Sequence, residues 1–303
     1  MYRSLLTLLV ALPPSWSWSA SFVRQAACMR FGDFRLRIPQ TTKGMGDPVP
    51  PRTAHAAIRN RGPITDELER LLQGQSTGVA LEIASGTGAH IDLFARSLPG
   101  WKWQPTEYEN DMIPEIDEWT QRARGPGNVL PAVPLDVQWD PEHWPRPPTE
   151  GEGGYDLVVS INMIHIAAQG CVEGLARGAG RVLRPGGRLV LYGPFALSGL
   201  LVPASNRDFH TSLRARSGGE WSIRDVVDVA RAADAHGLEL SEMKAMPSNN
   251  FVVVFTKVQG SSKATGGSSR EEATNQEGRR PQPLAERIAA VVEPARAAAA
   301  GRA

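Results

Sequence analysis

One acidic residue and two glycines, located where an apolar run ends, are the residues of this sequence best placed to do chemistry. The run Val79–Ile83 contains Glu82 and leads into Gly86 and Gly88, after which a helical pattern begins near His90. Glycine permits backbone conformations that a side chain excludes, and the first N–H groups of a helix are free to face a ligand. A strand, a glycine turn and a helix in this order predict a cofactor-binding turn.

Two cofactor classes use such a turn. A dinucleotide site needs a third glycine three residues after Gly88, and that position is Ile91. An acid four residues before the first glycine instead suits S-adenosylmethionine, because the Glu82 carboxylate would hold its cationic amino-acid end directly or through water. We therefore predict S-adenosylmethionine as the cofactor, bound by Glu82, Ala84, Gly86 and Gly88. The open alternatives are an NAD-dependent oxidoreductase and a strand-turn-helix unit without a ligand.

Two further acids follow later candidate strands. Glu107 ends the strand that begins at Trp103, at the distance from the glycines where open α/β nucleotide sites keep an acid for the ribose hydroxyls. The alternative for Glu107 is an ordinary surface carboxylate in an acidic loop. Asp136 follows the apolar stretch 129–135 and is the candidate contact to the adenine amine.

The order of elements predicts an α/β fold. Apolar strands alternate with helical patterns over 65–73, 90–97, 114–122 and 168–182. Short alternating units of this kind imply a parallel sheet covered on both faces. A last helix over 223–236 and two strands around 238–243 and 251–257 would add an antiparallel edge pair. We expect a doubly wound, Rossmann-like, mostly parallel seven-stranded sheet with helices on both faces.

At this level of detail the chain resembles a known family. Residues 52–257 resemble the methyltransferase-like protein 26 family, a branch of the class I (seven-stranded) S-adenosylmethionine-dependent methyltransferases. The matching stretches are Arg59–Arg61 with Pro63 and Ile64, Leu81–Gly88, Asn162–Ile166, Leu191–Phe195, Ser205–Asn206, Ser212–Arg216, Trp221 with Arg224 and Asp225, and Met246–Phe251. The chain departs from the family pattern at two positions. Ile58 stands where an acidic residue is usual, and Glu107 stands where Asp is usual. The resemblance implies a methyltransferase with no settled acceptor.

Methyl transfer from a sulfonium needs a base only if the acceptor must lose a proton. The candidates lie at the carboxyl ends of the fourth and fifth strands. His165 is the candidate base, with a histidine satisfied by backbone at a helix start as the alternative. Tyr192 is the second catalytic candidate, with ordinary core as its alternative. Asn162 is expected to contact the cofactor or form the floor of the site.

The acceptor is expected to be small and polar. The stretch Gly193–Glu220 reads as a long irregular loop over the site, and long loops in compact domains are usually functional. It offers four candidate pocket residues, namely Phe195, Asn206, Asp208 and His210. On the other side of the site, Arg59 or Asn60 would close over the cofactor, although capping and surface ion pairs would explain both residues equally well.

Composition narrows the possible partners. The formal net charge is +1, without a basic stripe, which argues against a nucleic-acid partner. The chain has two cysteines, without the paired spacing of a disulfide framework or a zinc site, so we expect no metal. A small-molecule acceptor is expected ahead of a protein, with no membrane span in the domain. The sequence does not indicate an oligomeric state.

The two ends differ in composition from the centre. Residues 1–45 begin with an apolar run, too short to span a bilayer, followed by basic, acid-poor sequence typical of an organellar presequence for a plastid or mitochondrion. Cytoplasmic localisation is the alternative. Residues 46–258 form the predicted methyltransferase domain. Residues 259–303 read as a disordered, low-complexity tail, in which the alanine-rich segment 284–300 would form at most a transient helix because prolines interrupt it. The alternative to an enzyme is a non-catalytic methyltransferase-like module that binds the cofactor or a partner.

Overall fold

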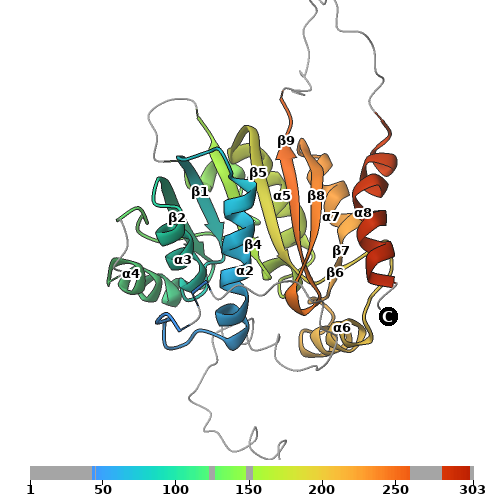
Figure 1. The fold of residues 1–303 in the computed structure, drawn as a ribbon, viewed down its shortest axis with the longest axis horizontal. Coiled ribbons are helices and arrows are strands. Elements are labelled where there is room, and N and C mark those ends of the chain that lie inside the picture. Colours follow the sequence, from blue (N-terminus) through green and yellow to red (C-terminus); the bar gives the residue numbers. More distant parts are fainter. Residues whose placement is uncertain (1–42, 45, 123–126, 148–152, 260–281, 301–303) are drawn as a thin grey trace, which may run out of the picture.

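The central element is a seven-stranded sheet in the order β3-β2-β1-β4-β5-β9-β8 (Figure 1). The computed structural model describes residues 43–44, 46–122, 127–147, 153–259 and 282–300. The strands of this sheet are β1 (Gly78–Ile83), β2 (Trp101–Glu107), β3 (Val133–Pro134), β4 (Tyr155–Ile161), β5 (Leu183–Gly193), β8 (Leu238–Met246) and β9 (Asn250–Lys257). Strands β1 to β5 pair in parallel, whereas β9 is antiparallel to β5 and β8. The predicted fold class, including its antiparallel edge pair, is confirmed.

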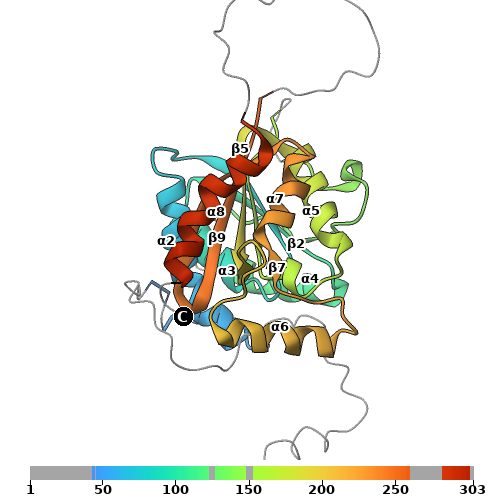
Figure 2. The same cartoon turned by 90° about the vertical axis from the view of Figure 1, so that its right-hand side faces the viewer.

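Helices cover both faces of the sheet (Figures 1 and 2). They are α2 (His55–Leu71), α3 (Ala89–Ser97), α4 (Ile113–Arg122), α5 (Gly170–Val182), α6 (Ala204–Arg216), α7 (Val226–Asp234) and α8 (Leu284–Ala300). A small two-stranded sheet pairs β6 (Phe195–Ala196) with β7 (Arg224–Asp225). None of the helices described here is long and apolar enough to cross a bilayer.

The apolar side chains form two main cores, one on each face of the sheet. In β4, Leu157 and Val159 belong to the core under α2 and α3, while Val158 belongs to the core under α5, α7 and α8. Successive residues of a strand point to opposite faces, so an almost wholly apolar strand is what a doubly covered sheet requires. The continuous apolar runs of the sequence are explained by this arrangement.

Helix α2 begins earlier than the sequence predicts. It starts at His55 rather than Thr65 and contains Pro63. A proline inside a helix removes one backbone hydrogen bond, and for that reason the pattern indicated a start beyond it. Burial of Ala56 and Ala57 before the proline and of Ile64 after it supports the helix on both sides. Arg59, Asn60 and Arg61 therefore lie within α2 and not in a preceding loop.

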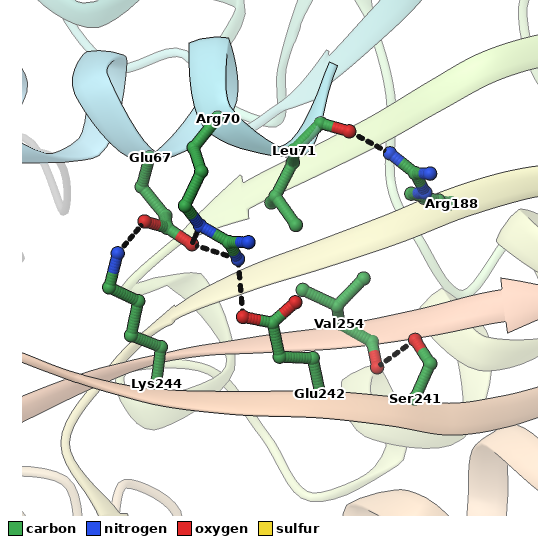
Figure 3. A network of polar contacts seen from close by, with 8 residues as sticks. All are labelled: Glu67, Arg70, Leu71, Arg188, Ser241, Glu242, Lys244 and Val254. Carbon is green, nitrogen blue, oxygen red and sulfur yellow. Dashed lines mark hydrogen bonds and ion pairs between the residues drawn. The ribbon is translucent and has the colours of Figure 1, made fainter. Parts of the chain in front are cut away.

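Charged side chains fasten the second half of α2 to the edge of the sheet (Figure 3). The buried Glu67 carboxylate accepts hydrogen bonds from Arg70 Nε at 2.8 Å and from Lys244 Nζ on β8. Arg70 also pairs with Glu242 on β8, and Arg188 on β5 donates to the Leu71 carbonyl. These contacts fix the helix whose first half lies at the candidate site.

The predicted loop Gly193–Glu220 is wrong in its middle, where it forms α6. This helix lies beyond the carboxyl ends of the parallel strands (Figure 1). It is mostly polar and packs through Leu213 and Phe209, one helical turn apart, onto Ile166 and Ile223. Only two large apolar residues in thirteen give a weak helical periodicity, which is why the sequence pattern missed this helix.

The predicted disordered tail is likewise wrong over α8. Ile288 and Val292 of this helix are 4% and 0% exposed and join the core beside α7 and β8. Arg287 pairs with Asp234 at 2.7 Å and with Glu239 at 2.7 Å. Tertiary packing thus stabilises a helix that contains Pro294 and that the composition alone disfavoured. The linker at 260–281 and the presequence prediction, apart from Lys43 and Gly44, lie outside the described residues.

Candidate functional site

A cavity opens at the carboxyl ends of β1, β2 and β4. The space between its walls is about 560 Å³ when the open solvent at its mouth is included. Helix α2 and the glycine turn after β1 form one side, and the segment after β4 forms another. The lining residues are Ala56, Ala57, Asn60, Glu82, Ala84, Ser85, Gly86, His90, Glu107, Ile161, Asn162, Met163 and Ile166. Five of the predicted cofactor contacts are among them, namely Glu82, Ala84, Gly86, Glu107 and Asn162.

The turn after β1 has the conformation that its glycines suggest. Gly86 and Gly88 have φ angles of 61° and 79°, and Ala84 also has a positive φ, of 57°. The Ser85 amide donates to the Thr106 carbonyl at 2.8 Å, which ties the turn to β2. Gly86 lines the cavity, whereas Gly88 is the N-cap of α3 and does not line it. The predicted contact from Gly88 is therefore replaced by a role in starting the helix.

Glu107 closes the base of this turn. Its carboxylate accepts the Gly86 amide at 2.7 Å, the Tyr108 amide at 2.8 Å and the Glu109 amide at 3.3 Å. The Glu107 side chain is 1% exposed, so it is not the surface carboxylate of the alternative interpretation. It sits at the end of β2 and faces the cavity, where an acid for ribose hydroxyls would be required.

Glu82 is a buried carboxyl group in the wall of the cavity. It is 2% exposed, and its Oε2 atom has no hydrogen-bond partner within the described ranges. Burial, with a smaller effect from the charge of Glu107, raises the pKa of Glu82 to about 8, and the Ser85 side chain opposes part of this shift. A buried carboxylate without a cation is unfavourable. The site is therefore suited to a positively charged ligand group that would restore the ionised form.

Asn60 and His90 line the cavity together, although they come from different helices. His90 Nε2 lies 2.8 Å from Asn60 Oδ1. Burial, followed by the charge of Arg61, lowers the pKa of His90 to about 3, so the imidazole is neutral. His90 and Ser85 were not singled out from the sequence. A histidine in the first turn of a helix has no distinctive signature until its partner is known.

The segment after β4 supplies a polar residue and an apolar wall. Asn162 has a φ of 61°, and its backbone N–H donates to the Tyr192 carbonyl at 2.7 Å. Its Oδ1 atom is buried without a partner among the described residues. Beside it, Ile161, Met163 and Ile166 line the cavity. This combination fits an apolar ligand body with a small number of polar contacts.

The environment of His165 contradicts its predicted role as a general base. It is 2% exposed, does not line the cavity, and accepts the Arg224 amide on Nδ1 at 3.3 Å, which leaves the proton on Nε2. Burial, followed by the charge of Arg224, lowers the pKa of His165 to about 3, while a backbone hydrogen bond with Ser222 opposes part of this shift. The ring packs edge-on against Phe195, with centroids 4.9 Å apart. These features describe a structural histidine.

The glycine after Tyr192 is required by this packing. A Cβ on Gly193 would lie 2.4 Å from His165 Nε2 and 3.3 Å from Asn162 Oδ1. Tyr192 itself is 4% exposed and packs in the core under α2 and α3, away from the cavity lining. Its predicted catalytic role is therefore not supported, and the core alternative agrees with its position.

The predicted acceptor-pocket residues do not gather at the cavity. Phe195 is buried against His165, and Asn206 donates to the Val202 carbonyl at 2.9 Å, close to the start of α6. Asp208 is exposed and His210 is half-buried on α6. Helix α6 instead reaches the site indirectly, because it packs on Ile166, which lines the cavity.

Asp136 also lies outside the cavity lining. Its carboxylate accepts the Gln138 amide at 2.9 Å, in the turn that follows β3. The backbone of this segment is nevertheless joined to the site, because the Leu135 amide donates to the Glu107 carbonyl at 2.9 Å. For Asp136 to contact the adenine, the bound cofactor would have to extend past β2, beyond the cavity lining.

Arg224 orders the segment after β4 through hydrogen bonds to its backbone. Its guanidinium donates to the carbonyls of Ile164 at 2.9 Å and Ala167 at 2.7 Å. It also contacts the Glu220 carbonyl and the Gln169 side chain. Backbone acceptors carry no sequence signature, so the extent of this network was not predictable.

The described ranges hold no group of three or more His, Cys, Asp or Glu side chains arranged for a metal ion.

Solved structures with the same fold include an O-methyltransferase family 2 protein from Planctomyces limnophilus in complex with apigenin, with a TM-score of 0.52 and 18% identity over 67% of this chain and 57% of that one. An O-methyltransferase family protein from Burkholderia thailandensis gives 0.50 and 16%, over 67% and 60%. The S-adenosylmethionine-dependent methyltransferase SibL gives 0.51 and 17%, over 67% and 59%. These similarities show the class I methyltransferase fold, and the chain spans less than two thirds of each of these proteins.

A family model covers the same sheet and cavity. It is described as a protein of unknown function, DUF938, and it matches residues 51–257. The match begins just before α2 and ends at the last residue of β9, so that α8 lies outside it. Because the match extends over well more than half of the sequence, the chain belongs to the DUF938 family.

Proposed function

We propose that this protein is an S-adenosylmethionine-dependent methyltransferase that acts on a small polar acceptor. The observation that carries the proposal is the meeting of Glu82, Gly86 and Glu107 in one cavity at the carboxyl ends of parallel strands. In open α/β sheets, ligands bind at this edge. A non-catalytic module would not need to keep these three residues at the cavity. Their presence there favours the enzyme over that alternative.

The residues of the cavity fit the cofactor. The unpartnered Oε2 atom of Glu82 would accept a hydrogen bond from the cationic amino group. The carboxylate of Glu107, at the end of β2, would accept hydrogen bonds from the ribose hydroxyls. The left-handed backbone at Gly86 lets the main chain approach the ligand closely.

When bound, the cofactor supplies a methyl group that is already activated for displacement. The chain must therefore mainly hold the acceptor in line with that group and exclude water. The apolar residues Ile161, Met163 and Ile166 line the cavity and would perform both tasks. With His165 buried, no side chain is assigned as a base, and the proposal favours an acceptor that is already deprotonated or loses its proton to water.

A small acceptor agrees with a cavity that has few polar groups in its wall and with a net charge near zero. Nucleic acid is not favoured, since its recognition requires a basic surface. Incubation of the full chain with methyl-labelled S-adenosylmethionine tests this proposal when a metabolite mixture, transfer RNA, DNA and a protein extract are offered separately. We expect label in the metabolite fraction. Label that appears first in a nucleic acid would contradict the acceptor class, and absence of transfer by a protein that binds the cofactor would favour the non-catalytic alternative.

The finer assignments belong to the same proposal. We propose that this member of the DUF938 family also falls within the methyltransferase-like protein 26 family, on the stretches that resemble it.

We also propose residues 46–258 as the catalytic domain and residues 1–45 as an organellar address. Reporters fused after residue 45 and after a shorter initiator segment should differ in location, and the same diffuse distribution for both would contradict the address.

A further inference from the structure

Asn60 presents an amide group to the cavity in a fixed orientation. The side chain is 9% exposed, and its Oδ1 atom is held by His90 Nε2 at 2.8 Å. A neutral imidazole that faces an amide oxygen carries its proton on the facing nitrogen, so His90 donates. The Nδ2 atom of Asn60 makes no hydrogen bond in the part of the chain that the structure describes, which leaves both of its N–H groups available to a ligand.

The charge of the surroundings indicates what this donor would bind. None of the described residues that line the cavity is Lys or Arg, so an anionic ligand group must be met by neutral donors there. Arg61, the next residue of α2, does not line the cavity, and its guanidinium donates to the carbonyls of Gly44 at 2.5 Å and Asp47 at 3.0 Å. After burial, the positive charge of Arg61 is the second cause of the lowered pKa of His90, the residue that holds Asn60. An anion beside Asn60 would be stabilised by the same field.

The same cavity therefore offers a site for a cation and a site for an anion. Glu82 is the carboxyl group that a cation would complete, while Asn60 is the donor that an anion would complete. A zwitterionic α-amino acid end carries both charges on adjacent atoms. Resting on the proposed function, we infer that Asn60, positioned by His90 and backed by the charge of Arg61, binds the carboxylate of the cofactor's amino-acid end.

Calorimetric titration of the full chain with two ligands tests this inference. The ligands are S-adenosylhomocysteine and its decarboxylated analogue, which keeps the amine and loses the carboxylate. Asn60→Ala should weaken binding of S-adenosylhomocysteine by about 10- to 100-fold, the usual value of a hydrogen bond to a charged group. Binding of the analogue should stay at the wild-type level, because the analogue has no carboxylate to lose.

Two further variants separate this role from a structural one. Asn60→Asp keeps the acceptor for His90 and replaces only the donor by a negative oxygen, so it should weaken S-adenosylhomocysteine more than Asn60→Ala while sparing the analogue. Arg59→Ala is the matched control: Arg59 lies on the same helix, but it is exposed and does not line the cavity, so the structure gives no support to its predicted closure over the cofactor and the change should affect neither ligand. Glu82→Gln should weaken both ligands, because both retain the amine.

The outcomes also distinguish this inference from the function on which it rests. If the wild-type protein binds neither ligand, the proposed function fails. If the wild-type protein binds both and the Asn60 variants weaken both equally, or neither, the inference is overturned and the Asn60–His90 pair only joins α2 to α3. Selective loss of S-adenosylhomocysteine supports the inference.

Discussion

The carboxylate of Glu107 accepts the amide N–H of Gly86 at 2.7 Å, and this bond joins the ends of β1 and β2 at the floor of the cavity. The two residues are 21 positions apart in the chain. Glu107 therefore shapes the glycine turn in addition to facing the ligand. Carboxylate oxygens can accept more than one hydrogen bond, so the two roles are compatible.

Cofactor binding is expected to release a proton near neutral pH. The raised pKa of Glu82, about 8, keeps the carboxyl mostly protonated at pH 7 in the free protein. A cationic amino group beside Glu82 favours the ionised form, so binding lowers this pKa and the proton leaves. Affinity should consequently rise with pH up to about 8. Calorimetry at pH 7 in buffers of different ionisation enthalpy should detect the release, and Glu82→Gln should abolish it. Binding of the wild-type protein without proton release would contradict the assigned contact.

Glu67 is expected to contribute to stability through the network of Figure 3. Its carboxylate is 3% exposed and bonded to Arg70 and Lys244, which are about 40% exposed and so partly screened. Glu67→Gln should therefore lower the free energy of unfolding by roughly 1–2 kcal/mol, less than for a fully buried pair. Urea unfolding measures the change. Glu69→Gln, which removes a more exposed partner of Lys43, is the control and should change stability by less. Equal effects would show that burial of Glu67 is not what matters.

Gly193 and His165 are expected to be energetically coupled. Gly193→Ala would place a Cβ 2.4 Å from His165 Nε2, and such overpacking costs roughly 1–3 kcal/mol. In a His165→Ala background the ring is absent, so the same change should cost much less. A double-mutant cycle by chemical unfolding measures the coupling. If His165→Ala instead preserves stability and cofactor affinity but abolishes turnover, His165 is a catalytic group and the structural assignment is wrong.

Helix α8 is expected to depend on the burial of Val292. Val292→Asp places a charge at a fully buried position and should free the helix, at a cost of about 2–3 kcal/mol or more. Limited proteolysis should then cleave within 284–300 much faster than in the wild-type chain. Ala290→Asp, at an exposed position of the same helix, is the control. Rapid cleavage of the wild-type chain at the same rate would support the disordered tail indicated by composition.

The sequence predicted the parts of the site that depend on local order. Glu82 and Gly86 belong to one strand and the turn after it, so their placement follows from a short motif. The bond between Asn60 and His90 joins positions 30 apart on two helices, and no local pattern indicates it. His165 was predicted as a base from its position after β4, but only packing against Phe195 and Gly193 determines that it is buried.

The misassigned helices have a related cause. Composition and periodicity describe what a segment does alone, and α6 has few apolar residues while α8 contains a proline. Each becomes a helix because a few side chains, such as Leu213 and Val292, find a core built by distant parts of the chain. This information lies in the tertiary contacts.

The central claim is that the cavity at the glycine turn binds S-adenosylmethionine. Its most direct test is calorimetric titration of two proteins, the full chain and its Gly86→Val variant, with S-adenosylhomocysteine and with NAD. Gly74→Val is the matched control, because Gly74 also has a positive φ, of 86°, but lies outside the cavity lining. The account predicts that the wild-type chain and Gly74→Val bind S-adenosylhomocysteine and not NAD, and that folded Gly86→Val binds neither, since a branched side chain cannot adopt the required backbone. Unchanged affinity of folded Gly86→Val, or binding of NAD alone, would contradict it.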